Sequence, residues 1–255
     1  MSKQLVIFRD LGSMDYKTAW DYQESLLQEN VRIKSEIRSQ LSEVGILPSD
    51  SQPPTANCQL STVNYLLFVE HPPVYTLGKS GHIENVLLSE ENLKARGIDF
   101  FRTNRGGDIT FHGPQQIVGY PILDLEKFYT DIGKYLRNIE EVIILTLKEY
   151  GIDSGRSAGE TGVWLDADKK GRERKICAIG VRSSRWITMH GFAFNVNTDL
   201  DYFNFIIPCG IQDKQVTSLQ KELGRPVDFG EAKEKVKRNF EKVFEAELRS
   251  IDNSQ

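Results

Sequence analysis

The stretch KICAIGVRSSRWITMHGFAFNV, residues 175–196, decides the fold class. Its two apolar parts, Lys175–Arg182 and Thr188–Val196, predict two strands with no helix between them. Further strands are predicted at 5–9, 65–70, 74–77, within 100–125 and at 163–165. The strands are grouped between helices, without the strand–helix alternation of a doubly wound parallel sheet. We therefore expect one α+β domain over residues 1–255, with a central mixed or antiparallel β-sheet flanked by helices.

Helical spacing of apolar residues predicts the helices beside this sheet. Residues 15–41 read as a helix capped by Asp15, residues 89–96 as a short helix capped by Ser89, and residues 131–150 as a helix that Gly151 ends. A last helix is expected at about 231–248, so residues 230–255 read as a C-terminal helix and a frayed tail. Residues 45–62 are rich in proline, serine and asparagine, which predicts a mobile loop insertion.

Composition narrows the function classes. The 255 residues are 39% hydrophobic and 27% charged, with a net charge of only -4. Proteins that bind nucleic acid usually carry a basic surplus, so nucleic acid is not an expected partner. No apolar run reaches the ~18 residues of a membrane span, and the apolar run near the start is shorter than a signal sequence requires. We expect a cytoplasmic protein with no membrane partner.

The three cysteines, Cys58, Cys177 and Cys209, are widely spaced and show no metal-binding pattern, so no metal is expected. Cys209 lies between a proline and a glycine, where the backbone is irregular, and is the better candidate nucleophile. Cys177 is its rival, because in a strand it shares a face with Lys175. Its apolar neighbours nevertheless favour core packing, and Cys58 lies in the polar loop.

A glycine-rich segment, RGGDITFHGPQQ at residues 105–116, is the second candidate site. Paired glycines allow a backbone to approach a ligand closely, while Arg105 and His112 supply charge and a hydrogen bond. The alternative is a hairpin turn with a buried, satisfied histidine. Lys175 also has an alternative interpretation, the solvated end of an apolar strand. The residues by themselves leave both alternatives open.

Together these segments resemble the octanoyltransferase family of lipoate biosynthesis, a branch of the biotin/lipoyl attachment superfamily. The resemblance runs from about Tyr65 to Leu219 and rests on several motifs in the expected order. These are EHPPVYTLG at 70–78, RGGDITFHGP at 105–114, KICAIG at 175–180, HGFAFNVN at 190–197, Asp199-Leu200, and Pro208-Cys209-Gly210. The family usually has a glycine at the position of Gln115, and the 45–62 loop has no counterpart.

The resemblance implies roles for particular residues. Cys209 is expected to carry an acyl thioester, with Lys175 as its catalytic partner. Substrate-binding residues are expected to be Arg105, Gly106, Gly107, Asp108, Ile109, Thr110, Phe111, His112, Ala178, Ile179, Gly180, Gly191, Phe192 and Ala193. An apolar slot for the acyl chain has Tyr75, Leu77, Phe111, Ala178 and Phe192 as candidate walls. Backbone amides near Gly180 or Gly107 are candidate oxyanion donors.

The expected reaction moves an octanoyl group from octanoyl-acyl carrier protein to a lysine of a lipoyl domain. The acceptors would be 2-oxoacid dehydrogenase complexes and the glycine cleavage H protein, and the enzyme would be a monomer that needs no cofactor. The nearest alternative is an ATP-dependent lipoate–protein ligase of the same superfamily, which needs no nucleophilic cysteine. A non-catalytic module that binds an acyl chain or acyl carrier protein is the alternative from another class.

Overall fold

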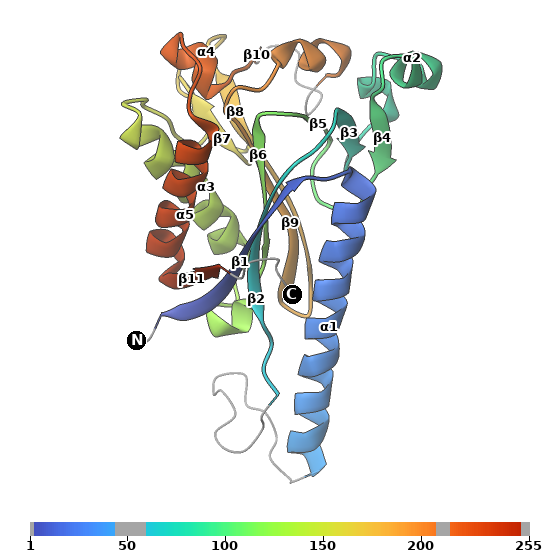
Figure 1. Cartoon of the computed structure of the whole chain (residues 1–255), viewed down its shortest axis with the longest axis vertical. Helices are drawn as coiled ribbons and strands as arrows, with labels where there is room; N and C mark the ends of the chain where they lie inside the picture. The colour runs from blue at the N-terminus through green and yellow to red at the C-terminus, as the bar shows by residue number, and fades with distance from the viewer. Residues whose placement is uncertain (1–2, 44–59, 208–214, 251–255) are drawn as a thin grey trace.

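The computed structural model describes residues 3–43, 60–207 and 215–250. These residues form a single α+β domain, with helices on both faces of a large twisted sheet (Figure 1). The strands are β1 Gln4–Ser13, β2 Asn64–Glu70, β3 Val74–Leu77, β4 Asp99–Arg102, β5 Ile109–His112, β6 Gln116–Ile122, β7 Val163–Leu165, β8 Arg174–Ser184, β9 Ile187–Asn195, β10 Gln215–Val216 and β11 Ala246–Ser250. The α-helices are α1 Tyr16–Glu43, α2 Glu90–Ala95, α3 Ile132–Glu149, α4 Leu219–Leu223 and α5 Phe229–Phe244, with 3₁₀ turns η1 Ile83–Asn85, η2 Leu125–Lys127 and η3 Leu200–Phe205.

Within the described part of the chain, the larger sheet has eight strands. Its order is β10–β8–β9–β6–β2–β1–β11, and β7 also pairs with β8. The strands β8, β9, β6 and β2 pair antiparallel with one another in that order, whereas β10 runs parallel to β8, and β1 runs parallel to both β2 and β11. The predicted mixed sheet is therefore confirmed. A smaller sheet, in the order β4–β3–β5, stands beside it and carries α2.

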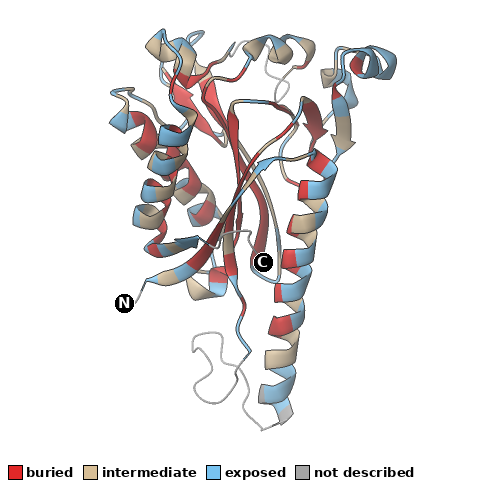
Figure 2. Cartoon of the chain, viewed as in Figure 1, coloured by how far each residue is buried: buried red, intermediate tan, exposed pale blue. Residues whose placement is uncertain are grey.

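The helices form because their apolar residues recur on one face and a side chain caps each start. Asp15 accepts a hydrogen bond from the amide of Thr18, and Asp131 accepts one from the amide of Lys134. α3 and α5 cover one face of the sheet and α1 runs along the other (Figure 1). The central strands between these layers are buried, while the outer faces of the helices are exposed (Figure 2).

A buried ion pair fixes the second half of α1 against the sheet. Lys34 Nζ lies 2.8 Å from Asp124 Oδ1, and both side chains are buried. Asp124 also accepts a hydrogen bond from the hydroxyl of Thr62. Because a buried charge needs both a partner and hydrogen bonds, this arrangement specifies where the long helix lies.

One sequence expectation is wrong at the C-terminal end. The helix predicted to reach residue 248 ends at Phe244, where Glu245 adopts a left-handed conformation with φ 50°. Residues 246–250 then form β11, which pairs in parallel with β1. The local sequence is compatible with a helix, but pairing with the first strand of the chain decides the outcome. Of the predicted 45–62 loop, residues 45–59 lie outside the described residues, as does the tail at 251–255.

Candidate active site

A cavity of about 450 Å³ lies between the turn that joins β4 to β5 and the strands β8 and β9. Its volume falls within the range of small-molecule pockets, about 300–1,000 Å³. Most of its exposed wall is apolar, with charged and polar groups at separate points. The apolar side chains that line it include Val118, Leu136, Ile179, Val181, Phe192, Ala193, Phe203 and Val216. The polar ones include Tyr16, Arg105, Asp108, Thr110, His112, Gln116, Tyr120, Thr161, Lys175, His190 and Asn195.

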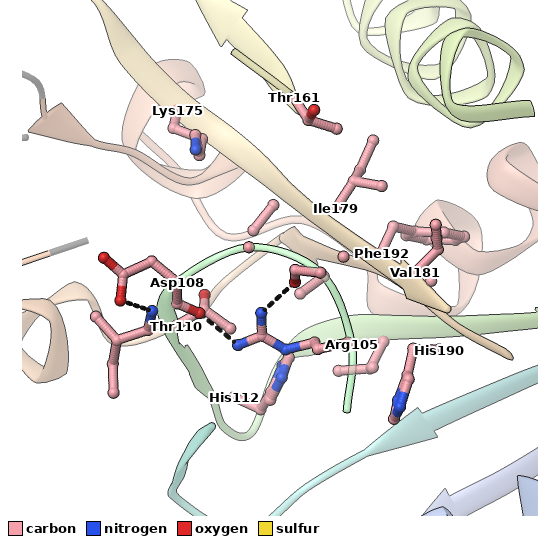
Figure 3. A pocket seen from close by; sticks show the side chains of 18 of the residues that line it. Arg105, Asp108, Thr110, His112, Thr161, Lys175, Ile179, Val181, His190 and Phe192 are labelled. Atoms are coloured by element: carbon pink, nitrogen blue, oxygen red, sulfur yellow. Dashed lines mark hydrogen bonds between the residues drawn. The ribbon is translucent and has the colours of Figure 1, made fainter. Parts of the chain in front are cut away.

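Arg105 holds the glycine-rich turn in shape. Its guanidinium donates hydrogen bonds to the carbonyl oxygens of Thr76, Gly106 and Asp108, at 2.5, 2.9 and 2.9 Å. The Gly106 amide in turn donates to the carbonyl of Val181, which joins the turn to β8. Figure 3 shows Arg105 between His112 and His190, below the strand that carries Ile179 and Val181. The arginine is 7% exposed, so these contacts replace most of its hydration.

Three glycines on adjacent strands allow the backbones around the cavity to lie close together, and Gly180 and Gly191 line the cavity itself. Gly180 pairs with Gly191 across β8 and β9, and Gly119 lies on β6 next to them. A Cβ on Gly191 would lie 2.1 Å from the carbonyl oxygen of Gly119, and one on Gly180 would lie 2.8 Å from that of Gly106. Only glycine therefore lets the turn and the strands approach this closely.

A chain of buried hydrogen bonds runs from the turn to the far side of the cavity. Arg105 donates to the Thr76 hydroxyl at 2.9 Å, and that hydroxyl lies 3.3 Å from His112 Nε2. His112 Nδ1 lies 3.0 Å from Gln116 Oε1, and the Gln116 amide group donates to Asn195 Oδ1 at 2.8 Å. These partners make His112 a neutral imidazole that carries its proton on Nδ1. Burial, the largest cause, sets the pKa of His112 well below its ordinary value.

Two more histidines lie beside the cavity in the same neutral state. His71 donates from Nδ1 to the carbonyl of Met14 at 2.7 Å, and its Nε2 accepts from the hydroxyl of Tyr120 at 2.8 Å. His190 lies on β9 with φ 60° and bonds from Nε2 to Asn104 Oδ1 at 2.7 Å. Burial lowers the pKa of His71 to about 4 and that of His190 to about 3.

Described residues on both sides of the segment 208–214 line the same cavity, although the segment itself, with Cys209, lies outside the described residues. Phe203 precedes the segment and Val216 follows it, and both line the cavity. The amide of Ile207 donates to the carbonyl of Asn85, and the amide of Thr217 donates to the carbonyl of Lys175 at 3.0 Å. The chain therefore re-enters the described structure beside the candidate site, at Val216 and Thr217.

Lys175 and Cys177 have different surroundings in the structure. Lys175 is 9% exposed and lines the cavity, where Figure 3 shows it at the opposite end of β8 from Val181. A solvated strand end would be far more exposed, so that alternative is wrong. Cys177 is fully buried in the core between the sheet and α3, and burial raises the pKa of its thiol far above the ordinary value. Cys58, like Cys209, lies outside the described part of the chain.

The structure brings together thirteen of the fourteen expected substrate-binding residues. Phe111 is the exception: it packs against Tyr202 with ring centroids 4.6 Å apart and does not border the cavity. Tyr75 and Leu77, expected as walls of the acyl slot, are buried in the same separate cluster as Phe111. Side chains alternate between the two faces of a strand, so Thr110 and His112 face the cavity while Phe111 faces away.

Sequence reasoning missed several polar residues at the cavity. Tyr16 begins α1, and burial raises the pKa of its hydroxyl to about 12. Gln116, Tyr120 and Asn195 come from β6 and β9, and His190 stands directly before the expected Gly191–Ala193 segment. The available signal was position: Gln116 lies within the 105–116 segment, and His190 and Asn195 lie within the 190–197 motif, although none of them was assigned a role. Tyr16 and Tyr120 reach the cavity only through the fold.

Gln115 stands where the octanoyltransferase family usually has glycine, and the turn forms nevertheless. Gln115 adopts φ 60°, a conformation that costs a non-glycine residue about 1 kcal/mol or more. Its amide donates to Glu70 Oε2 at 2.8 Å, and its side-chain oxygen accepts from Asn197 Nδ2 at 2.7 Å. These contacts hold the strained residue, so the glycine is not needed for the turn to form.

Over residues 3–43, 60–207 and 215–250, no three histidine, cysteine, aspartate or glutamate side chains cluster as a metal site. Within the same ranges, no helix combines the length and apolar character needed to cross a membrane.

The fold and cavity define a class of protein with a buried lysine and a glycine-rich turn around an apolar pocket. The family profile described as lipoyl protein ligase A/B catalytic domain matches residues 15–241, and the chain belongs to this family. A curated octanoyltransferase of Christiangramia forsetii is 55% identical over 250 residues, which cover 98% of this chain and 99% of that protein. A curated octanoyltransferase of Flavobacterium johnsoniae is 57% identical over 249 residues, covering 97% of this chain and all of that one.

Solved structures support the same fold. A lipoate-protein ligase A bound with ATP matches with a TM-score of 0.67 at 15% identity, covering 99% of this chain and 90% of that one. A bipartite lipoate protein ligase from Thermoplasma acidophilum matches with a TM-score of 0.64 at 16% identity, covering 99% and 89%. At 15–16% sequence identity, these matches show a shared fold and carry no conclusion about activity.

Proposed function

We propose that this protein transfers an octanoyl group from octanoyl-acyl carrier protein to a lysine of lipoyl domains, through a thioester on Cys209. The acceptors are the lipoyl domains of 2-oxoacid dehydrogenase complexes and the glycine cleavage H protein. The curated relatives support the octanoyl group and the transfer over the full length of the chain. The family profile includes ligases and does not separate the two functions, and the solved ligase structures, at 15–16% identity, bear on the fold alone.

The observation that carries the proposal is the position of Lys175. Its side chain lines the cavity, and its backbone carbonyl accepts from Thr217, just after the segment that contains Cys209. Phe203 on the other side of that segment lines the same cavity. A neighbouring ammonium favours a thiolate over a thiol, and the thiolate is the nucleophile. For the Cys177 thiol, burial favours the neutral form and outweighs the opposing effect of Lys175, so its pKa is raised.

In the proposed reaction, the Cys209 thiolate attacks the octanoyl thioester of acyl carrier protein. The carbonyl–sulfur bond to the carrier breaks, and Lys175 gives a proton to the departing thiol. The lipoyl-domain amine then attacks the Cys209 thioester, gives a proton to Lys175, and forms the amide as the cysteine sulfur leaves. Backbone amides at Gly180 and Gly107 are the candidate oxyanion donors. The apolar wall of Ile179, Val181 and Phe192 receives the acyl chain.

The proposal places a monomeric enzyme in the cytoplasm, where a reducing environment keeps Cys209 as a thiol. The test is intact-mass spectrometry after incubation with octanoyl-acyl carrier protein, without ATP. We expect one added octanoyl group that disappears on later addition of a lipoyl domain. Cys209→Ser should form no adduct, Lys175→Ala should form it slowly, and Cys177→Ala should behave as wild type. An adduct that persists in Cys209→Ser, or transfer that requires ATP, would contradict the proposal.

A further inference from the structure

We propose that Trp164 is a positioning residue whose indole face seats the ammonium of Lys175 at the cavity. The inference rests on the proposed function, since it assigns Lys175 a working position. The Lys175 Nζ atom lies 4.5 Å from the centroid of the Trp164 ring. Both residues are largely withdrawn from solvent, with Trp164 2% and Lys175 9% exposed. An ammonium over an indole face is attracted by the ring electrons, and this attraction grows as water is excluded.

A β-bulge creates this contact. Val163 on β7 pairs with Cys177 on β8, and the next residue, Trp164, pairs with Lys175. One step along β7 thus corresponds to two steps along β8, with Ile176 as the extra residue. In a regular ladder Ile176 would lie opposite Trp164, and the indole would face away from the lysine. Bulges are frequent beside active sites because they redirect a side chain in this way.

The backbone on both sides of the indole is fixed. Trp164 exchanges two hydrogen bonds with Gly155, of 2.8 and 2.9 Å, on the edge of β7 away from β8. Two residues earlier, the amide of Gly162 donates to Glu140 Oε1 at 3.0 Å. Glu140 is fully buried on α3, and its other oxygen accepts from Arg137 and Arg156 at 2.6 and 2.9 Å. The short strand β7 therefore cannot slide past Lys175 without breaking a buried carboxylate network.

Gly162 lets β7 lie close to the backbone of β8 beside the lysine stem. A Cβ on this residue would lie 2.6 Å from the carbonyl oxygen of Cys177 and 3.6 Å from Cε of Lys175. Gly162 also has φ 126°, which side chains rarely adopt. The lysine stem thus runs past a glycine and ends over an aromatic ring. Lysine has four rotatable side-chain bonds. Because the contact with the indole restricts them in advance, less conformational entropy is lost when the amine reacts.

A double-mutant cycle tests the proposal. The readout is the initial rate of octanoyl adduct formation from octanoyl-acyl carrier protein, measured by intact mass under single-turnover conditions. We expect Trp164→Leu to slow the reaction about tenfold, the size that a desolvated cation–π contact supports. Trp164→Phe, which keeps an aromatic face, should restore most of the rate. In a Lys175→Ala background, Trp164→Leu should change the rate less than about twofold, because the contact is already absent.

The matched control is Trp186→Leu, which removes an indole that is 37% exposed at the turn between β8 and β9. It should keep the wild-type rate. Circular dichroism shows whether Trp164→Leu folds. If it does not, a ring-fluorinated tryptophan at position 164 serves instead, because it keeps the size of the ring but weakens the attraction of its face for a cation. This protein should also react more slowly than wild type. The proposed role of Trp164 would be contradicted by a wild-type rate in the fluorinated protein. It would also be contradicted if Trp164→Leu slowed the reaction equally with and without Lys175. Failure of the proposed function looks different: wild type would then form no adduct at all.

Discussion

Acidification should destabilise the fold steeply between pH 6.5 and pH 5, because three histidines are buried in the neutral state beside the cavity. Burial lowers the pKa of His71 to about 4 and of His190 to about 3, and it sets that of His112 well below the ordinary value. In the unfolded chain a histidine titrates near ~6.5. The folded values are thus the lower ones, so the stabilisation is complete above about pH 6.5 and is lost as the pH falls toward them.

The magnitude follows from the two numerical values. At pH 5 an unfolded histidine is almost fully protonated, whereas His71 and His190 in the folded protein remain almost fully neutral. Linkage then gives a loss of about 2 kcal/mol for each of the two residues relative to pH 8. Together they remove about 4 kcal/mol, a large part of the ~5–15 kcal/mol by which domains are usually stable. His112 adds to this loss in the same direction.

The assay is urea unfolding followed by far-ultraviolet circular dichroism at pH 8, 6.5, 5.5 and 5. His71→Gln should reduce the loss of unfolding free energy between pH 6.5 and pH 5 by about one protonation, roughly 1–2 kcal/mol. His82→Gln, a change at an exposed histidine before η1, is the matched control. The reasoning is refuted if the unfolding free energy of wild type stays flat down to pH 5, or if both variants show the same dependence.

Three further predictions concern the cavity and its surroundings. Gly180→Val should abolish octanoyl transfer, because a Cβ there lies 2.8 Å from a carbonyl oxygen of the glycine-rich turn, while Gly155→Ala, with open space around its Cβ, should keep the rate. Glu140→Leu should lower the unfolding free energy measured in urea by about 2 kcal/mol, because the buried amide of Gly162 loses its acceptor. The control Glu141→Leu, which removes a half-exposed ion pair, should lower it by less than about 0.5 kcal/mol. Equal losses in the two variants would contradict this prediction. Cys177→Ala should leave the transfer rate unchanged, and native wild-type protein should resist alkylation at Cys177, since the thiol is buried with a raised pKa.

Local signals made most elements predictable from the sequence. The strand Val74–Leu77 was predicted with its observed bounds, and the caps Asp15 and Ser89 were predicted at the positions where the structure has them. Apolar alternation and capping act within a few residues, so the sequence carries them directly. The end of the last helix was not predictable in this way. Residues 246–250 become a strand because they meet β1 from the other end of the chain.

The residues of the site likewise differ in whether the local sequence or the tertiary fold determines their position. Arg105, Lys175, Gly180 and Gly191 were identified from motifs shared with the octanoyltransferase family, without the fold, whereas Gly119 on β6 was not. Trp164 was not, because its place opposite Lys175 depends on a bulge that only the pairing of β7 with β8 determines. Phe111 was misplaced because the face that a strand residue presents depends on which neighbour the strand packs against.

The pairing of Gln4–Phe8 with Ala246–Ser250 has a consequence for how the protein is made. A ribosome synthesises the first strand long before the last one emerges, so one edge of β1 stays open during almost the whole of translation. An open strand edge can pair with other chains. We expect nascent chains stalled before residue 246 to bind holdase chaperones through this edge and to aggregate on release, whereas in chains released after residue 250 the short strand β11 covers this edge of β1.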